Sequence, residues 1–467
     1  MRDSLDFTSM FSDFVVNQNH KTIPPNVIKA ATHAFTDTIG VGIGGSHDDA
    51  SNIAARWVLS NNEGQQSRLW ARGCNVTSAN AAFVNAIQSH VLDYDDSSIN
   101  LRGHPSATLV AVAVAVGEST GASGLEVLTA YAIGLEVSTK LSPALGPKHY
   151  FRGWHTSATV GIFGATSVAA KLLGLNKSQL CHAWGIAASQ SSGLTRNFGT
   201  MTKALHIGNA ARNGVIAAQL AKDGFTSDTN IFDGSGGFVD VYTGYKKDGG
   251  DQGDATESDQ AFTTLGEQVI RLASPWELLD PGLYVKRWPC CYASHRPIAG
   301  MINIMSRYRL DPDNIVSIDI GFLPGATHPL NHSRPKNELE AKFSVEYPIA
   351  AVILDGKIDL ESFEDQKVLR SAAQKLISKV GRFSIPDEKT YNGLTGYNII
   401  RIRTTNDLIE EKITCTPGAP YEPMSDQDRA QKFLSCAAKA MDEVQAKRLL
   451  EKTARLANLE TVLELWS

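Results

Sequence analysis

The segment from residue 90 to residue 106 holds the densest group of side chains that could do acid–base or metal chemistry. His90 precedes three aspartates, Asp93, Asp95 and Asp96, and His104 follows them. Carboxylates can orient a histidine for proton transfer, and carboxylates that share a helical face can hold Mg²⁺ through a bound phosphate. A helix end with solvated acids is the third reading. Because the chain shows no second acidic motif and no basic phosphate clamp, we expect no metal site here.

Two further segments place basic side chains at or near the start of an apolar helix. His155 comes directly before the apolar stretch 156–174, where a helix N-terminus would suit an anionic ligand, although a lone histidine there also fits a capping role. Lys203 and His206 lie three residues apart on one face of a predicted helix rich in Ala and Gly. A buried Lys–His pair is costly unless it meets an anion, so Lys203 is the best candidate for contact with a substrate carboxylate.

A third basic segment comes later in the chain, where Lys286 and Arg287 stand beside aromatic residues and His295 follows. An ordinary surface loop is the alternative reading of this segment. Cys291 lies within it, but no histidine at a recognised spacing identifies this cysteine as a nucleophile.

Composition limits the class of protein. The 467 residues are 42% hydrophobic and 20% charged, and the formal charge of −5 gives no electrostatic reason to expect nucleic acid or an anionic membrane as a partner. Six cysteines are too few for a disulfide scaffold. The first residues do not resemble a signal peptide, and the longest uncharged apolar run, 107–117, is shorter than the roughly 20 residues that a bilayer requires. We therefore expect a cytoplasmic protein.

The elements that must position these residues fall into two types. The first 270 or so residues are predicted as buried helices, including 106–120, whose Ala/Val alternation also fits a strand. The GxGxxG match at Gly40–Gly45 follows a predicted helix rather than a strand, which indicates a helix end and loop and not a nucleotide site. The acidic, Gly-rich stretch 246–260 is predicted to be a loop.

Beyond this loop the pattern changes to an α+β type. Residues 316–322 alternate as a strand, with Val316 on the apolar face, and a second pair of strands turns at Thr405–Asn406. Helices are predicted between them at 345–356 and 365–381, and helical character returns near Pro417. The prediction is a mainly α fold with an α+β part: an all-helical domain from 1–272 and 418–467, and an α+β lid domain from 273–417.

Four segments, taken in order, resemble the MmgE/PrpD family. They are HVLDYDDS…GHPSA, GWHTSATVG, MTKALHIGNAARNG and VKRWPCCYASH, which begin at residues 90, 153, 201 and 285. Activities in that family include 2-methylcitrate dehydratase, cis-aconitate decarboxylase and iminodisuccinate epimerase. The resemblance implies a large helical domain from both chain ends, an α+β lid, a homodimer, and catalysis without a cofactor.

Carried over residue by residue, the resemblance implies a site between the helical domain and the lid. The residues expected to act in catalysis are His104, His155, Asp93 and Lys203, with Asp93 orienting one imidazole. Those expected to bind substrate are Ser97, Lys286, His206 and His295. Ser97 stands where the decarboxylases usually have threonine, and Cys291 where some have histidine. The lid tyrosine of those decarboxylases has no clear counterpart in 327–335, and His295 instead supplies the lid imidazole.

The resemblance implies a cofactor-independent lyase that acts on a small di- or tricarboxylate. Dehydration of a 2-methylcitrate-like hydroxy acid is the first prediction, with decarboxylation of a cis-aconitate type and epimerisation of an iminodisuccinate type as alternatives. A degenerate member that serves only as a helical binding module is the non-enzymatic alternative. All of these readings share a small polycarboxylate as ligand.

Overall fold

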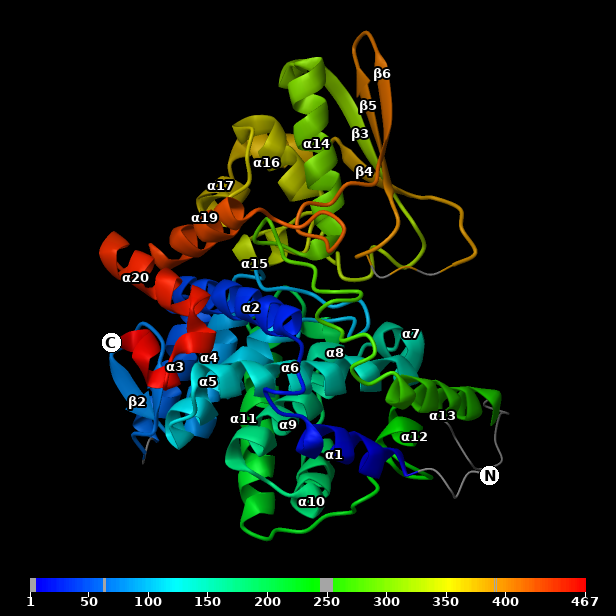
Figure 1. Cartoon of the computed structure of the whole chain (residues 1–467). Coiled ribbons are helices and arrows are strands. Elements are labelled where there is room, and N and C mark those ends of the chain that lie inside the picture. The colour runs from blue at the N-terminus through cyan, green and yellow to red at the C-terminus, as the bar shows by residue number, and fades with distance from the viewer. Residues whose placement is uncertain (1–5, 62–63, 244–254, 390, 392) are drawn as a thin grey trace.

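Most of the chain is helical, and the longer helices surround one hydrophobic core in the lower half of Figure 1. The computed structural model describes residues 6–61, 64–243, 255–389, 391 and 393–467. The helices of this part are α1 Phe7–Asn17, α2 Pro25–Gly44, α3 Asp49–Ser60, α4 Ser78–Val91, α5 Ser106–Thr120, α6 Gly124–Leu141, α7 Gly146–Phe151, α8 Thr156–Thr159, α9 Gly161–Leu173, α10 Lys177–Ala188, α11 Thr202–Lys222, α12 Phe238–Thr243 and α13 Ala255–Ile270. A two-stranded antiparallel ribbon, β1 Ser67–Leu69 and β2 Cys74–Val76, lies beside them.

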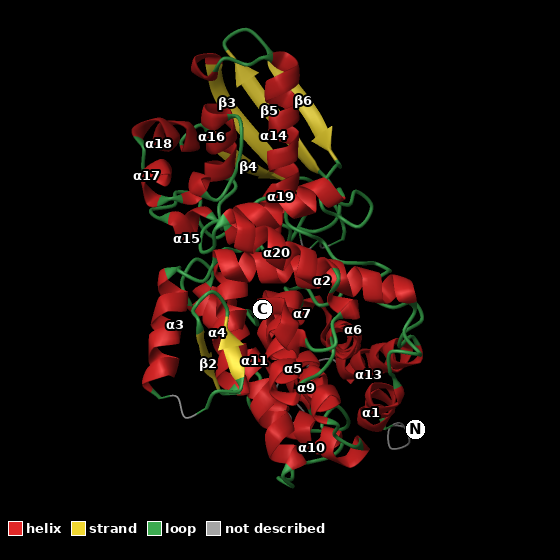
Figure 2. Ribbon diagram, turned by 60° about the vertical axis from the view of Figure 1, so that its left-hand side comes forward, coloured by secondary structure: helices red, strands yellow, loops and turns green. Residues whose placement is uncertain are grey.

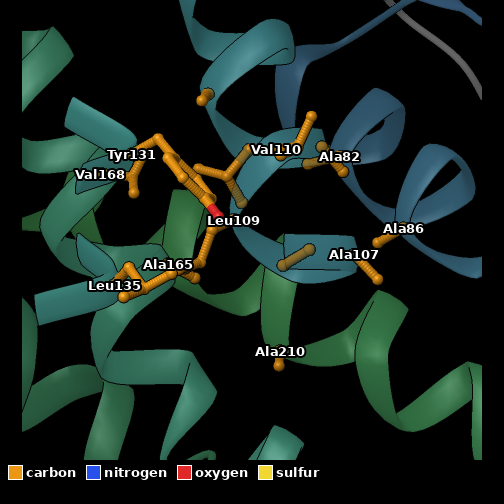
Figure 3. Packing of buried hydrophobic residues seen from close by; sticks show 14 of the residues in the cluster. Ala82, Ala86, Ala107, Leu109, Val110, Tyr131, Leu135, Ala165, Val168 and Ala210 are labelled. Carbon is orange, nitrogen blue, oxygen red and sulfur yellow. The ribbon is translucent and has the colours of Figure 1, made fainter. Parts of the chain in front are cut away.

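Small side chains allow the central helices to pack closely. Figure 3 shows Ala107, Leu109 and Val110 of α5 between the alanines of α4 and the side chains of α6 and α9. The prediction of a buried helix at 106–120 is confirmed, because α5 is buried along nearly its whole length. The alternation of Ala and Val does not produce a strand here, since alanine has low β propensity and both residue types fit a helix buried on every side.

The glycines of the GxGxxG match lie inside α2, so the prediction of a helix end at Gly40 is wrong by one turn. A Cβ atom on Gly40 would lie 2.6 Å from the Phe433 ring, and one on Gly42 would lie 2.7 Å from the Trp70 ring. Glycine is therefore used here for close helix packing, and the helix continues to Gly44. Nucleotide binding finds no support in this arrangement.

The lid is an α+β unit with its own core, seen at the top of Figures 1 and 2. Its four strands are β3 Ile315–Phe322, β4 Val380–Ser384, β5 Asn398–Thr404 and β6 Leu408–Ile413, in the order β4-β3-β5-β6, with only β3 and β4 parallel within this sheet. Its helices are α14 His295–Tyr308, α15 Glu338–Ala341, α16 Glu346–Asp355, α17 Asp365–Val368 and α18 Ser371–Ile377. The fold class and the strands β3, β5 and β6 are confirmed.

Two details of the lid differ from the prediction. The segment 365–381 is not one helix, because it divides into α17 and α18 and then enters β4 at Val380. In β3 the pairing register shifts between Ile315 and Ser317, so Val316 is 50% exposed and Ile315 takes the buried position. A β-bulge moves one side chain to the opposite face, which strict alternation does not predict.

The C-terminal helices return to the helical domain. Helices α19 Asp426–Ala437 and α20 Glu443–Ala454 pack against α2, so the orange-red C-terminal helices lie beside the blue helix α2 in Figure 1. Within this contact, Nζ of Lys432 lies 2.8 Å from Oδ1 of Asp37 and 2.8 Å from the carbonyl oxygen of Tyr94. The C-terminal segment therefore supports the loop after α4 from behind. The exact domain boundaries stay a prediction.

Two segments of the sequence remain to be placed: the stretch 246–260, predicted as a loop, and the apolar stretch 156–173. Residues 246–254 of the predicted loop 246–260 lie outside the described residues, while residues 255–260 belong to α13, so the loop prediction is wrong for this second part. One described stretch, Thr156–Leu173, is long and apolar enough to cross a membrane, and 83% of it is buried inside the protein. Such burial is what a core helix of this length requires.

Candidate active site

A small cavity lies where the loops of the helical domain meet the lid. The helical domain lines it with most of the polar groups: Asp93, Ser97, Arg102, Gly103, His104, Tyr150, His155, Phe198 and Lys203. The lid contributes Cys291, Tyr292, Ala293, Pro329, Phe343 and Leu394. The cavity therefore holds all four residues predicted to act in catalysis, together with Ser97.

The carboxylate of Asp93 is shared by two lysines. Nζ of Lys203 lies 2.5 Å from Oδ1 of Asp93, and Nζ of Lys286 lies 3.0 Å from Oδ2. Burial opposes ionisation of Asp93, but these two ammonium groups hold its pKa well below the usual value. Asp93 is therefore an anion, and one positive charge is left over from the two lysines.

The backbone around Asp93 explains how the lysines reach it. Asp93 follows the end of α4 with φ at +50°, a left-handed conformation that turns the chain sharply. Ser97 then pairs with Tyr284, each backbone N–H donating to the other's carbonyl, at 2.9 and 2.8 Å. This pairing brings Lys286 to the loop, where its ammonium group also donates to the carbonyl oxygen of Asp93 at 2.8 Å.

Asp95, and not Asp93, holds the imidazole rings. Its Oδ2 lies 2.7 Å from Nδ1 of His90 and 3.6 Å from Nδ1 of His104. Burial opposes ionisation of Asp95, yet the neighbouring histidines and Lys286 lower its pKa below the usual value. The prediction that Asp93 orients a histidine is therefore corrected, because both oxygens of Asp93 already face lysines.

His104 is fixed in the cavity wall from several sides. Its backbone N–H donates to Oγ of Ser157 at 2.9 Å, an approach that needs glycine at position 103, since a Cβ there would lie 2.4 Å from that oxygen. Its Nδ1 lies 2.8 Å from the carbonyl oxygen of Asp96 and 3.3 Å from Oγ of Ser97. Nδ1 is thus occupied, and Nε2 is left for a ligand.

His155 meets His206 across the start of two helices. His155 precedes α8, and its Nδ1 lies 3.1 Å from Nδ1 of His206, which is in the first turns of α11. One of these two nitrogens must carry the proton that joins them. Nε2 of His155 is buried without a hydrogen-bond partner. His206 thus positions His155 rather than lining the cavity itself.

Burial makes these histidines poor bases in the empty site. It lowers the pKa of His104 well below the usual value, against the opposing effect of Asp95. It does the same to His155, assisted by the charge of Lys203, and it lowers the pKa of His206 to about 4. At neutral pH these rings are therefore uncharged until an anion enters.

Lys203 is held between aromatic rings as well as by Asp93. Its Nζ lies 5.4 Å from the centre of the Phe198 ring and 4.9 Å from that of Phe343. Burial lowers the pKa of Lys203, although Asp93 opposes this shift, whereas the charges of Asp93 and Asp95 outweigh burial and raise the pKa of Lys286. Of the two lysines, Lys203 is the one that faces the cavity.

Two residues predicted to bind substrate lie behind the cavity wall. Lys286 is fully buried, and its contacts are with Asp93 and Asp95, so it acts on a ligand only through these carboxylates. His295 is also fully buried, stacks on Tyr292, and has Nε2 3.3 Å from the carbonyl oxygen of Cys290. Burial lowers the pKa of His295 to about 3. Because His295 does not line the cavity, this ring does not supply the expected lid imidazole.

The sequence reasoning missed Arg102 and the apolar part of the wall. Arg102 lines the cavity with φ at +54°, and its guanidinium group forms no hydrogen bond or ion pair with the described residues. The one feature of the sequence that could have indicated Arg102 as a site residue is its position two residues before His104. Tyr150 and Leu394 come from segments that carried no motif, so they became visible only in the fold.

Cys291 lines the lid side as a neutral thiol. Burial raises its pKa to about 11, and the charge of Asp93 adds to this effect. Its backbone N–H donates to the carbonyl oxygen of Lys342 at 2.9 Å, which ties the residue to the lid core. A protonated thiol is a weak nucleophile, so the arrangement gives no support to covalent catalysis by this residue.

Among the described residues, one group could offer three ligand atoms to a metal ion: His90, Asp95 and His104, with these atoms within 4.8 Å of one another. Oδ2 of Asp95 already accepts from His90, and the ammonium group of Lys286 lies 3.8 Å from its Oδ1. A cation placed there would meet this positive charge. The donor set therefore fits a proton-carrying network better than a metal site.

A cavity with an anion-attracting lysine, two neutral imidazoles and a covering lid is that of an acid–base enzyme that acts on a small anion. Comparison with known families agrees with this class. Residues 9–249 match the MmgE/PrpD N-terminal domain, and residues 288–458 match the MmgE/PrpD C-terminal domain. The chain belongs to the MmgE/PrpD family, and it is a lyase.

Several curated relatives of this chain are cis-aconitate decarboxylases. The human enzyme is 27% identical over 456 residues, covering 93% of this chain and 88% of the relative. The enzyme of Aspergillus terreus is 24% identical over 479 residues, covering 98% and 95%. A cis-aconitate decarboxylase-like protein of Aspergillus oryzae is 25% identical over 486 residues, covering 98% and 96%.

Proposed function

We propose that this protein decarboxylates a small unsaturated polycarboxylate of the cis-aconitate type. The observation that carries the proposal is that Lys203, held by Asp93, shares one cavity with His104 and His155. The activity of its relatives, which are cis-aconitate decarboxylases, supports decarboxylation over the dehydration that was predicted first. Epimerisation has no such support among them.

The chemistry needs one proton and a group that stabilises negative charge. In a substrate of this type the carboxylate on the methylene carbon leaves as CO₂. The electron pair of the broken C–C bond forms a new double bond to the middle carbon, and the pair of the old double bond takes a proton at the far carbon. Negative charge collects at that far carbon and its carboxylate, where Lys203 stabilises it in the transition state.

His155 is the proposed proton donor. Its Nδ1 meets His206, so its Nε2, buried without a partner, is the atom left for the substrate. Substrate carboxylates raise the pKa of a nearby imidazole, so the complex takes up one proton on binding. The imidazolium then gives this proton to carbon and returns to its neutral form. His104, also with Nε2 left over, is the alternative donor.

The test is ¹H NMR in D₂O with cis-aconitate. Decarboxylation gives new signals of a terminal methylene, one deuterium at the far carbon, and CO₂. New vinyl signals from a hydroxy acid such as 2-methylcitrate would instead support dehydration. Loss of an α-proton signal without a new carbon skeleton, with iminodisuccinate, would support epimerisation.

Variants connect the reaction to this site. We expect Lys203→Ala and His155→Ala to lose at least a hundredfold in rate, about 2.7 kcal/mol of barrier. Lys222→Ala changes an exposed lysine at the far end of the same helix, and His20→Ala an exposed histidine, so both should keep the wild-type rate. If either site variant keeps more than about a tenth of that rate, its residue lacks the proposed role.

A further inference from the structure

The lid half of the cavity is uncharged. Among the described residues, the lid lines the cavity with Cys291, Tyr292, Ala293, Pro329, Phe343 and Leu394. The cysteine is a neutral thiol, and Phe343 and Leu394 present apolar side chains that are 4% and 6% exposed. The ammonium group of Lys203 lies 4.9 Å from the Phe343 ring, and the hydroxyl of Tyr292 is buried without a hydrogen-bond partner. Against Leu394, Pro329 and Ala293, in contrast, a carboxylate would lose its water without gaining a cation.

The charges of the site all come from the helical half or from directly behind it. Arg102 and Lys203 line the cavity, and Lys286 lies behind it. The carboxylates of Asp93 and Asp95 oppose these three cations, so one positive charge remains while the histidines are neutral. With the one proton that the complex takes up on binding, a ligand with two carboxylates brings this group to zero net charge, and a ligand with three leaves one negative charge. Buried charge without compensation is costly, so the site favours the dianion.

The reaction itself shows which carboxylate is dispensable. One carboxylate must leave as CO₂, and the carboxylate on the far carbon must accept the developing charge. The third, on the middle carbon, takes part in neither event. An apolar group can therefore replace it without removing any electron pair that the decarboxylation uses.

We infer that the substrate carries an apolar group on its middle carbon in place of that carboxylate, and is thus a 3-alkyl-substituted unsaturated dicarboxylate. The alkyl group would lie against Leu394, Pro329 and Ala293, and the two carboxylates would face Arg102 and Lys203. This inference rests on the proposed decarboxylation for the choice of the middle carbon. The choice between an apolar group and a third carboxylate is tested by ligand binding and does not depend on turnover.

The experiment compares two ligands that cannot react. Tricarballylate is the saturated tricarboxylate, and 3-isopropylglutarate replaces its middle carboxylate by an uncharged isopropyl group of similar size. Calorimetric titration of the wild-type protein should give a dissociation constant at least tenfold lower for 3-isopropylglutarate. Equal or tighter binding of tricarballylate would overturn the inference, as expected if the lid half surrounds the departing carboxylate. Failure of 3-isopropylglutarate to bind would overturn it as well.

A lid variant tests whether the lid half of the cavity causes the preference for 3-isopropylglutarate over tricarballylate. Leu394→Lys places an ammonium group in the lid half and should reduce the preference for 3-isopropylglutarate at least tenfold. Leu408→Lys adds the same charge to the same domain at a site that is 62% exposed and outside the cavity, and should leave the preference unchanged. An equal loss of preference in both variants would mean that the lid half does not select the ligand. If Leu394→Lys does not fold, the wild-type titration decides alone.

A turnover assay separates this inference from the proposed function. The unsaturated counterparts are cis-aconitate and 3-isopropylglutaconate, and the second should have the higher kcat/KM. Tight binding of 3-isopropylglutarate without decarboxylation of either compound would contradict the proposed reaction and leave the ligand class standing. Decarboxylation of cis-aconitate with the higher kcat/KM would overturn the ligand class and leave the reaction standing.

Discussion

The ammonium group of Lys203 and the carboxylate of Asp93 form a buried ion pair, with Nζ 2.5 Å from Oδ1. Lys286 binds the other oxygen of the same carboxylate from behind, at 3.0 Å. Each group of this cluster is less than a tenth exposed. Lys286 therefore keeps Asp93 ionised, and Asp93 holds Lys203 in place at the cavity wall. The cluster explains why two lysines are needed although only one of them faces the ligand.

Removal of Asp93 should cost more stability than removal of Lys203. Asp93→Asn leaves the buried ammonium group of Lys203 without a counter-ion and Lys286 with Asp95 alone, 3.8 Å away. Breaking such a pair from one side costs about 3 kcal/mol of unfolding free energy. Lys203→Met leaves Asp93 paired with Lys286. We expect the methionine variant to lose activity at least a hundredfold and to unfold within about 1 kcal/mol of wild type.

Urea unfolding followed by far-UV circular dichroism measures both variants. Lys222→Met, at the exposed end of the same helix, controls for the substitution itself. Equal stability of the Asp93 and Lys203 variants would contradict the shared role of this carboxylate.

The pH dependence of kcat/KM should show the need for a proton. Burial lowers the pKa of His104 and His155 in the free enzyme, so both are neutral above pH 6.5. Only the protonated donor is productive, so kcat/KM should fall about tenfold for each pH unit between 6.5 and 8.5. Because bound carboxylates raise the donor's pKa, kcat should fall less steeply over the same range. A kcat/KM that rises with pH would show that a free-enzyme base, and not an acid, limits the reaction.

Asp95 should act on the rate and not on binding. It contacts Nδ1 of His90 at 2.7 Å and lies 3.6 Å from Nδ1 of His104, so Asp95→Asn removes the charge that orients both rings. We expect kcat to fall at least a hundredfold with no loss of affinity for a non-reacting dicarboxylate, because the variant also removes a negative charge from the site. A parallel loss of both quantities would indicate that Asp95 only holds the fold together.

Local pattern was enough for some elements, but not for β4, for the division between α17 and α18, or for the roles within the site. The strands β5 and β6 follow from the spacing of apolar residues, and the helix α5 follows from the low β propensity of its alanines. Asp93 contacts lysines and Asp95 contacts a histidine because the backbone turns at Asp93, where φ is positive. The residue types in this segment do not predict that conformation. The same holds for the bulge that exposes Val316, because it arises from pairing with a distant strand.

Lys286 and His295 show the limit of carrying positions over from a family. Both lie in the predicted segment, but one is behind Asp93 and the other is inside the lid core. Their depth is set by packing between the two domains, which residue spacing along one segment does not contain. Arg102 was not predicted as a site residue, because a single arginine in a loop belongs to no motif or periodic pattern.

Arg102 should contribute to ligand affinity rather than to the chemical step. It lines the cavity and has no ion-pair partner among the described residues, so a ligand carboxylate is its available counter-ion. Arg102→Ala should raise KM at least tenfold with kcat within about fivefold of wild type, and Arg102→Lys should recover part of the loss. Arg196→Ala, in an exposed turn of the same domain, is the control. A fall in kcat with unchanged KM would place Arg102 in the transition state instead.

Asp96 should make the protein less stable as the pH rises. Its side chain is buried against Ser106, and burial raises its pKa from the usual 3.8 to about 7. Below pH 3.8 the carboxyl group is protonated in both the folded and the unfolded state, and stability is highest with respect to this group. Between about pH 4 and pH 7 the unfolded state ionises first, so stability falls, and the loss is complete above pH 7.

Burial also raises the pKa of Glu118 and of Glu136 to about 7. Asp96→Asn isolates the effect of Asp96, because the wild-type protein and the variant both keep these two glutamates. The amide has the shape of the protonated acid and can still hydrogen-bond to Ser106. At pH 4 the variant should match wild type, and at pH 8 it should be more stable by on the order of 3 kcal/mol in urea unfolding. A stability difference that is the same at both pH values would show that Asp96 is ionised in the folded protein at pH 4 as well as at pH 8. A nearby cation would then offset the cost of burying its charge.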